Sequence, residues 1–338
     1  MKEAMFWEKT DGIVNCRLCA WKCNITPGGN GFCRVRKNID GRLYSLVYGK
    51  ACSVAVDPVE KKPLFHFAPG SQTLSVATVG CNFRCSFCQN WEISQSEDVI
   101  GEDLPPERLR ELINDYSGFS WTYTEPTMFY EYFYDTAELC RGINKYHVWV
   151  TNGYTMPEPV KKASGFLNAV NVDYKGNETF YRAFCQTHLE PVQETLKLYK
   201  KLGIWIEITN LLIPGHNDSD SDVKEMVDWI ADNLGQVPVH FSRFFPHHKL
   251  SADVTSMKAL ERAAGIARER LDYVYIGNIR NPSENTHCHN CKALLIERSG
   301  LSVTGMNLVK KGGSYHCPSC STKIPVAGMQ WSPMAKSS

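Results

Sequence analysis

Residues 80–90 read G-C-N-F-R-C-S-F-C-Q-N and bring three cysteines, Cys81, Cys85 and Cys88, into one short loop. Thiolates spaced C-x3-C-x2-C can close around one face of a cubane iron–sulfur cluster, because such clusters are held by cysteine. A 4Fe–4S cluster has four irons, so three protein ligands leave one open, as in reactive rather than closed structural metal sites. The alternative of three buried thiols or a partial zinc knuckle fits less well with the aromatic Phe87 and the strand-like run before the loop.

Strand-like and helix-like segments alternate around this loop over residues 71–280. Helical spacing is clear at Val223, Met226, Val227 and Ile230. Repeated strand–helix units predict an α/β fold with a parallel sheet and right-handed crossovers. About six units in about 200 residues favour a partial (β/α)6 barrel, since no G-x-G-x-x-G follows the first strand. Short β-branched or aromatic runs predict strands at 74–79, 119–123, 146–150, 167–172, 204–212, 237–242 and 273–276.

Polar residues follow these predicted strands at the points where they end. The carboxyl ends of the strands carry the chemistry in barrels of this kind, so we expect one shared site there. Simpler readings exist: Thr124 could cap a helix beginning at Pro126, and Asp173 and Lys175 could form a plain salt bridge. The segments that follow strands are the Cys81 loop, Thr124-Glu125-Pro126, Thr151-Asn152-Gly153, Asp173-Tyr174-Lys175 and Ser242-Arg243.

Two further cysteine groups flank this region, which we take as the middle of three domains (1–70, 71–280 and 281–338). Four thiolates in two C-x2-C pairs predict a zinc-ribbon or rubredoxin-like site near the C-terminus, holding zinc or iron, with His287, His289 and His316 as less favoured substitutes. The spacing of the N-terminal cysteines does not decide between a zinc knuckle and a second iron–sulfur cluster. The C-terminal set is Cys288, Cys291, Cys317 and Cys320, and the N-terminal set is Cys16, Cys19, Cys23 and Cys33.

Composition excludes several classes of protein. A chain of 338 residues with 43% hydrophobic residues is too apolar to be disordered. Its 37 basic and 36 acidic residues argue against nucleic acid as a partner. No window approaches the about 20 apolar residues of a membrane span, and we expect a cytoplasmic protein with reduced thiols. Cys52, Cys140 and Cys185 are expected to be core thiols, and the Lys61-Lys62 pair to be solvated surface.

The sequence resembles the radical S-adenosylmethionine superfamily over residues 71–280. It is most similar to the pyruvate formate-lyase activating enzyme-like branch and, within it, to the AmmeMemoRadiSam system radical SAM enzymes. The similarity rests on D-P-V-E-K-K-P-L-F-H-F-A-P-G-S at 57–71, the cysteine loop, and the N-terminal C-R-L-C-A-W-K-C and G-F-C-R-V-R. It implies a 4Fe–4S cluster that cleaves S-adenosylmethionine reductively to methionine and a 5′-deoxyadenosyl radical.

The resemblance also implies roles for individual residues. Cys81, Cys85 and Cys88 would hold the cluster, and the Phe87 backbone would lie near the adenine. Glu125 stands where relatives carry a Gly-Gly-Glu that meets the methionine amino group, although the two glycines are missing here. The remaining residues implied to lie near the cofactor are Thr151, Asn152, Asp173, Lys175 and His248.

Three functions are carried forward. The first is a radical enzyme that removes hydrogen from an unidentified protein, peptide or small-molecule substrate, supplied with electrons by a low-potential donor of the ferredoxin or flavodoxin type. The second is a glycyl-radical-enzyme activase. The third, of another class, is a metal-ribbon interaction protein in which the cluster is only structural.

Overall fold

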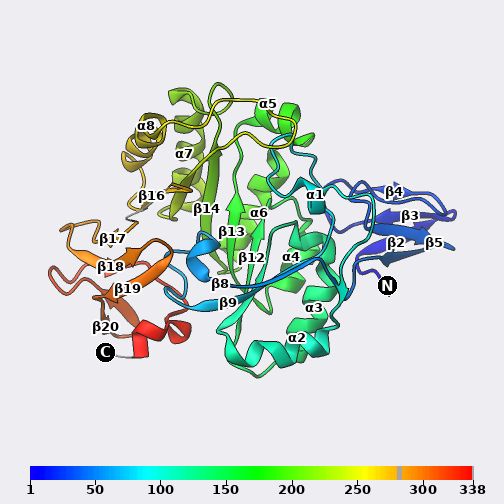
Figure 1. Ribbon diagram of the computed structural model, residues 1–338, viewed down its shortest axis with the longest axis horizontal. Coiled ribbons are helices and arrows are strands. Elements are labelled where there is room, and N and C mark those ends of the chain that lie inside the picture. The colour runs from blue at the N-terminus through cyan, green and yellow to red at the C-terminus, as the bar shows by residue number, and fades with distance from the viewer. Residues whose placement is uncertain (280–283, 337–338) are drawn as a thin grey trace.

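The computed structural model describes residues 1–279 and 284–336. One sheet of eight strands forms its centre, in the order β16-β15-β14-β13-β12-β11-β9-β8 (Figure 1). Seven strands run parallel, and β8 (Ser53–Pro58) pairs antiparallel with β9 at one edge. The parallel strands are β9 (Gln72–Ala77), β11 (Gly118–Trp121), β12 (Tyr146–Thr151), β13 (Leu167–Asp173), β14 (Trp205–Leu212), β15 (Val239–Arg243) and β16 (Val274–Gly277).

All seven predicted strands are present within two residues of their expected bounds. Helices follow β9, β11, β12, β13, β14 and β15 in turn, and the predicted strand at 273–276 is β16, a seventh parallel strand. The antiparallel β8 was not predicted. Val54 and Val56 on this edge strand are 44% and 47% exposed, so its apolar residues do not follow the usual buried pattern. The central sheet therefore begins before residue 71, the predicted domain boundary.

Helices connect the parallel strands, and local sequence explains where several begin. Pro106 occupies the first turn of α2, where its missing N–H costs nothing. The Ser219 and Ser256 hydroxyls accept hydrogen bonds from the backbone N–H groups of Asp222 and Ala259 and so cap α7 and α8. The helices are α1 (Trp91–Ser94), α2 (Pro106–Leu112), α3 (Tyr130–Leu139), α4 (Pro157–Ala163), α5 (Glu178–Phe180), α6 (Glu190–Lys201), α7 (Asp220–Leu234) and α8 (Met257–Arg268).

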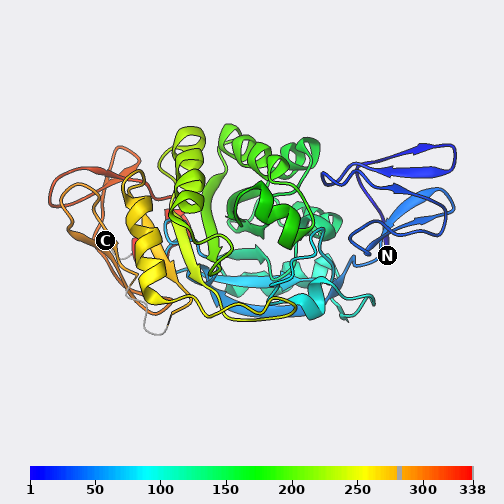
Figure 2. The ribbon, with the colours of Figure 1, turned by 90° about the horizontal axis from the view of Figure 1, so that it is seen from above.

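Small sheets lie at the two ends of the long axis of the molecule (Figure 2). At the N-terminal end, two three-stranded sheets consist of β1 (Lys2–Glu3), β6 (Arg42–Ser45) and β5 (Arg36–Ile39), and of β2 (Trp7–Thr10), β3 (Ile13–Cys16) and β4 (Asn24–Ile25). A two-stranded sheet pairs β7 (Lys50–Ala51) with β10 (Glu102–Asp103). At the C-terminal end, two more three-stranded sheets consist of β17 (Thr286–His287), β18 (Leu294–Ser299) and β19 (Ser302–Met306), and of β20 (Val309–Lys311), β21 (Ser314–His316) and β22 (Lys323–Ile324).

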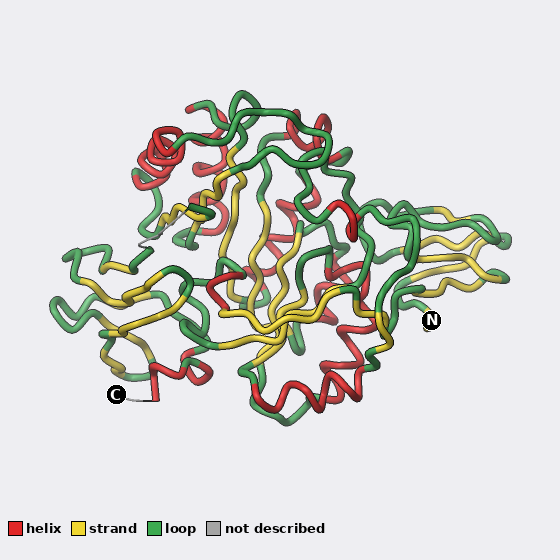
Figure 3. Tube along the Cα trace, viewed as in Figure 1, coloured by secondary structure: helices red, strands yellow, loops and turns green. Residues whose placement is uncertain are grey.

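Loops continue from the ends of the central strands (Figure 3), and the polar segments singled out above lie in the last residues of these strands or in the loops that follow. The interior of the sheet is rich in aromatic residues: Trp121 and Trp149, on β11 and β12, are fully buried. The longest helix in the described part of the chain is α7, with 15 residues, and no described helix is long and apolar enough to cross a membrane.

Candidate functional site

The loop after β9 places Cys81, Cys85 and Cys88 in one pocket of about 330 Å³ at the carboxyl ends of the parallel strands. Gly80 allows the chain to turn into this loop, because its φ is 100°, a region that side chains other than glycine rarely adopt. A Cβ at Gly80 would also lie 2.5 Å from Cγ1 of Val35. The fold therefore brings the three predicted ligands together at the expected edge of the sheet.

The surroundings of these thiols fit an iron–sulfur cluster. The backbone N–H of Phe83 and the Asn152 amide point at Sγ of Cys81, at 3.4 and 3.7 Å. Donors to cluster sulfurs are one of the means by which proteins tune such centres. Burial, followed by the nearby Glu125 carboxylate, raises the pKa of the Cys81 thiol well above its usual range. A thiolate at this position needs a compensating cation, as a metal cluster would provide.

Glu125 is buried at the centre of the site and holds two strand ends together. Its Oε1 accepts hydrogen bonds from Oγ1 of Thr151 (2.8 Å) and Oγ1 of Thr127 (2.7 Å), and its Oε2 accepts one from the backbone N–H of Asn152 (2.8 Å). It also caps the short helix Pro126–Phe129, which corrects the expectation that Thr124 does so. Thr124 instead donates to the Thr78 carbonyl. Acceptor capacity remains on Oε2 for one further donor in the pocket.

Asn152 links this carboxylate to the cysteine loop. Its amide donates to Oδ1 of Asn82 at 2.7 Å as well as to Cys81, and its own Oδ1 accepts from the backbone N–H of Tyr154. Thr151 and Asn152 both line the pocket. They therefore lie beside the three thiols, and their role near a cofactor stays a prediction.

Asp173 and Lys175 form a salt bridge of 2.9 Å on the opposite wall of the pocket. Burial alone would lower the pKa of Lys175, but Asp173, Cys85 and Cys185 raise it overall, so the ammonium stays charged. An ammonium beside a carboxylate is complementary to the carboxylate and amino groups of an amino acid. Phe87 is buried in the same wall, with Nζ of Lys175 5.7 Å from its ring centroid.

Lys62 is a pocket residue that sequence reasoning missed. It was expected on the solvated surface, but its side chain is only 2% exposed and its Nζ lies 2.7 Å from Oδ2 of Asp57. The ammonium also lies 4.3 Å from the ring centroid of Tyr123, whose hydroxyl donates to the same carboxylate. The signal was the D-P-V-E-K-K segment, in which Asp57 and Lys62 stand five residues apart. Their burial depends on contacts with β9 and β11 that no local pattern shows.

The structure places Cys185 against the site and His248 outside the pocket. Cys185 is a fully buried thiol, as expected, yet it lies against the site: a hydrogen bond with Cys185, together with burial, raises the pKa of Cys85. His248 does not belong to the residues that line the pocket. Its ring stacks on Trp91 at 4.8 Å, and the next two residues donate backbone hydrogen bonds to the Ser86 carbonyl. The segment therefore braces the cysteine loop from outside.

The C-terminal cysteines form a compact metal site. Their four sulfurs all lie within 4.8 Å of one another, with pairs at 3.6 Å for Cys288 and Cys320 and for Cys291 and Cys317. The two knuckles come from the turns around β17 and β21, and antiparallel pairs of strands, β18 with β19 and β20 with β21, lie beside them. Four thiolates in this arrangement suit zinc or a single iron. The N-terminal cysteines also come together, around a separate small cavity.

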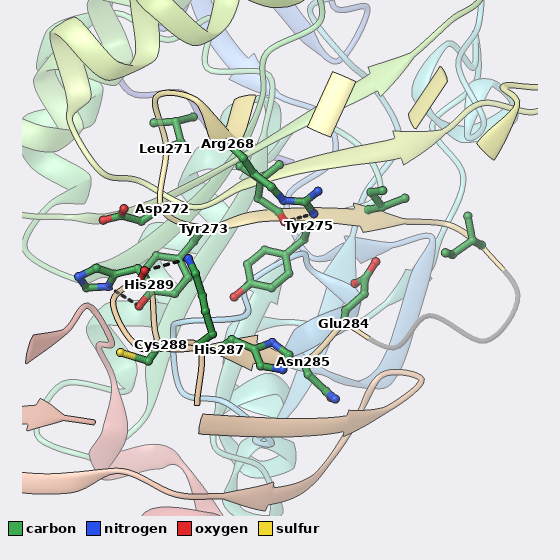
Figure 4. Close-up of a pocket in the computed structure, with 14 residues that line it drawn as sticks. Arg268, Leu271, Asp272, Tyr273, Tyr275, Glu284, Asn285, His287, Cys288 and His289 are labelled. Atoms are coloured by element: carbon green, nitrogen blue, oxygen red, sulfur yellow. Dashed lines mark hydrogen bonds between the residues drawn. The ribbon is translucent and has the colours of Figure 1, made fainter. Parts of the chain in front are cut away.

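A larger hollow of about 460 Å³ lies between the C-terminal sheets and the start of β16 (Figure 4). Residues along β16, from Val274 to Ile276, line this hollow, and none of the three cysteines of the central loop does. His289, considered above as a metal ligand, instead lies with Nδ1 3.0 Å from the Tyr273 hydroxyl, as Figure 4 shows. The hollow separates two packed units and presents no thiol triplet of its own.

Comparison with known proteins agrees with this geometry. The family model described as the radical SAM superfamily matches residues 75–230. Uncharacterized protein MJ0808 of Methanocaldococcus jannaschii is 47% identical over 336 residues, covering 96% of this chain and 99% of the relative. Uncharacterized protein MJ0674 of the same organism is 24% identical over 288 residues, covering 77% of each chain.

Part of this chain superposes on a solved structure. A radical SAM methyltransferase from Sphaerobacter thermophilus superposes with a TM-score of 0.50 at 17% identity, covering 62% of this chain and 67% of that one. Streptococcus suis SuiB bound to S-adenosylmethionine gives a TM-score of 0.49 at 13% identity, covering 66% and 53%. At such identities the methyltransferase likeness supports the arrangement of strands and helices and says nothing about the substrate.

Proposed function

Because residues 75–230 match the family model of the radical SAM superfamily, we propose that the chain cleaves S-adenosylmethionine with one electron to methionine and a 5′-deoxyadenosyl radical. That radical takes a hydrogen atom from the substrate, which leaves 5′-deoxyadenosine and a substrate radical. The observation that carries the proposal is the convergence of Cys81, Cys85 and Cys88 with polar groups from three strand ends in one pocket. When bound there, a 4Fe–4S cluster supplies the electron and one open iron.

The residues around the thiols would bind and orient the cofactor. Lys175 faces the pocket as a charged ammonium suited to the methionine carboxylate, and Glu125 and Asp173 offer acceptors to its amino group. Phe83 and Phe87 line the pocket with buried aromatic side chains and would shield a reactive radical from water. Asn152 fixes the thiol of Cys81 relative to these groups.

The substrate approaches from outside this pocket in our proposal. The pocket of about 330 Å³ is near the lower end of ligand sites in proteins, and in our proposal it has to hold both the cluster and S-adenosylmethionine. A second reactant would then reach across the mouth, as a segment of a protein or peptide can. We place the chain among the AmmeMemoRadiSam-type enzymes of the activating-enzyme-like branch, in the cytoplasm, with a ferredoxin or flavodoxin as electron donor and zinc at the C-terminal site.

Anaerobic turnover tests the proposal. The protein is loaded with iron and sulfide, reduced, mixed with S-adenosylmethionine, and assayed for 5′-deoxyadenosine by mass spectrometry. Cys85→Ala should abolish the product, while Cys140→Ala, which changes a buried thiol at the end of α3, should retain it. A fully loaded native protein that forms no product, alone or with cell extract, would instead favour the interaction protein with a structural cluster.

The activase alternative has its own readout. If the substrate is a glycyl-radical enzyme, 5′-deoxyadenosine should form in proportion to a long-lived organic radical on a partner protein, visible by electron paramagnetic resonance. Product without such a signal would exclude this alternative and leave hydrogen abstraction from another substrate.

A further inference from the structure

The four N-terminal cysteines surround one enclosed cavity. Cys16 ends β3, Cys23 precedes β4, and Cys19 and Cys33 come from the turns beside them; all four line the cavity together with Trp21 and Phe32. Cys16, Cys19 and Cys33 are buried, and Cys23 is half-buried. We propose that these four thiolates hold an iron–sulfur cluster that passes electrons to the centre at Cys81, Cys85 and Cys88, an inference that rests on the proposed function of that centre.

The spacing of the sulfurs favours a cluster over a single ion. Around one zinc, at about 2.3 Å per bond, tetrahedral sulfurs lie about 3.8 Å apart. The C-terminal cysteines have this geometry, with sulfur pairs at 3.6 Å. Among the residues that the structure describes, the C-terminal cysteines are the group whose four sulfur atoms all lie within 4.8 Å of one another. The N-terminal thiols ring their cavity more loosely, as expected when each ligand binds a different iron.

The N-terminal site packs directly on the loop that carries the central thiols. A Cβ at Gly80, next to Cys81, would lie 3.3 Å from the Cys33 carbonyl oxygen. The Trp21 indole donates to the Asn82 carbonyl at 2.6 Å, and its ring stacks on Phe32 with centroids 4.1 Å apart. An aromatic pair thus bridges the wall of one site and the backbone of the other.

Two arginines complete the connection. Arg84 donates to the carbonyls of Cys81 (2.8 Å) and Phe83, and through its other nitrogen to the carbonyl of Phe32, beside Cys33. Arg34 donates to the Gln95 carbonyl at 3.0 Å, and the Gln95 amide donates to the Cys85 carbonyl at 3.1 Å. These hydrogen bonds tie the backbone beside Cys33 to the backbone of the central cysteine loop, so the two cysteine groups are held next to each other, as a relay requires.

The electron balance is simple. A low-potential donor of the ferredoxin or flavodoxin class gives one electron to the N-terminal cluster, which becomes reduced. It is oxidised again when it passes that electron to the central cysteine loop, where breaking one carbon–sulfur bond of S-adenosylmethionine consumes it. The donor is the sole outside reductant, and no proton is needed before the substrate gives up its hydrogen atom.

Acid-labile sulfide decides whether the N-terminal site holds a cluster. The full chain with Cys81, Cys85 and Cys88 all changed to Ala is loaded anaerobically and assayed for iron, sulfide and zinc. We expect at least two irons and two sulfides per chain and a reduced paramagnetic signal that S-adenosylmethionine does not alter. Neither zinc nor a single iron at the C-terminal site contributes sulfide, so a sulfide-free protein with two zinc ions would overturn the proposal. Adding Cys19→Ser and Cys33→Ser should remove the sulfide.

A comparison of reductants tests the relay. In the Cys19→Ser, Cys33→Ser protein, 5′-deoxyadenosine formed with reduced flavodoxin should fall at least tenfold, whereas titanium citrate, a small reductant, should support the native amount. Equal rates with flavodoxin in both proteins would overturn the relay. Failure of the proposed function looks different: the native protein would hold both clusters and still form no product with either reductant.

Discussion

At the scale of single residues, the site depends on charges held where burial alone would remove them. Lys175 remains protonated because the Asp173 carboxylate and the thiols of Cys85 and Cys185 outweigh the cost of burial. Lys62 lies in a similar position, yet burial, only partly offset by Asp57, lowers its pKa to about 8. Of these two buried ammonium groups, that of Lys175 is therefore the more firmly charged and the better suited to an incoming carboxylate.

The first residue-scale prediction concerns this ammonium. Lys175→Gln should weaken S-adenosylmethionine binding about tenfold to a hundredfold, because a charge-assisted hydrogen bond contributes about 1.5–3 kcal/mol. Asp173 is 39% exposed and stays solvated, so folding should be little changed. Equilibrium dialysis of the loaded protein measures the effect. The exposed pair of Lys161 and Glu158 provides the control Lys161→Gln, and equal affinity of the two variants would contradict the assignment.

A second prediction concerns Gly80, where backbone and packing both require glycine. Gly80→Ala should lower cluster loading severalfold and destabilise the protein by about 1–3 kcal/mol, because φ is 100° and Val35 occupies the space of the new methyl group. Iron content and denaturant unfolding measure both effects. Gly265→Ala on the exposed side of α8 meets no atom within 4 Å and should leave loading unchanged while stabilising the helix by up to about 1 kcal/mol. Similar loading in both variants would count against the close packing at Gly80.

At the scale of elements, the strands were readable from sequence because each is buried on both faces of a covered parallel sheet. Their β-branched and aromatic runs stand out for that reason, and the turn residues after them mark the site. Edge strand β8 was not readable, since its exposed valines alternate with small residues. The burial of Lys62 and the position of His248 were also out of reach, because each is set by contacts with segments distant in the chain.

Strand β12 carries a prediction about pH. His147 is buried, accepts a hydrogen bond from the Trp121 indole, and has a pKa lowered by burial to about 3. The native state therefore keeps it neutral, while the unfolded chain takes up a proton below about pH 6.5. The contribution of this neutral histidine to the free energy of unfolding is complete above pH 6.5. It declines as pH falls toward 3, by up to about 1.4 kcal/mol per pH unit.

The measurement compares variants at two pH values. Between pH 7.5 and pH 5, His147→Gln should lose about 2 kcal/mol less stability than the native protein, as read from urea unfolding. The exposed His287 offers the control His287→Gln, which should follow the native pH dependence. If the stability of His147→Gln fell with decreasing pH as steeply as that of the native protein, the His147 ring would not be the group that controls acid sensitivity.

At the scale of the whole molecule, the C-terminal metal site is joined to the central sheet by one buried network. Arg298 donates to the Phe65 carbonyl at 2.7 Å and lies 3.6 Å from the buried carboxylate of Glu60. Nδ1 of His66 lies 2.7 Å from the Pro325 carbonyl, and the Ala68 N–H donates to the Ala327 carbonyl. Residues 59–68 thus lie between the metal site and β9, the strand that leads to the cysteine loop.

This arrangement predicts that losing the C-terminal metal has two separable effects. The apolar core there is small, formed by Leu295, Ile296 and Ile324 with two of the thiols, so the bound metal must supply much of its stability. Cys317→Ala should therefore release the metal and unfold residues 284–336. Arg298 would then leave Glu60 buried without its partner, an arrangement that costs about 3–5 kcal/mol, and residues 59–68 should loosen in turn.

Hydrogen exchange and metal analysis together test this order of events. Cys317→Ala should exchange rapidly over 284–336 and several times faster than the native protein over 59–68, while the iron and sulfide of the cysteine loop stay bound. Ser319→Ala, an exposed change in the same turn, should alter neither. Metal loss with native exchange rates in both segments would show that packing alone holds the C-terminal sheets. Loss of iron from the cysteine loop at the same time would show instead that the C-terminal sheets and the central sheet unfold as one unit.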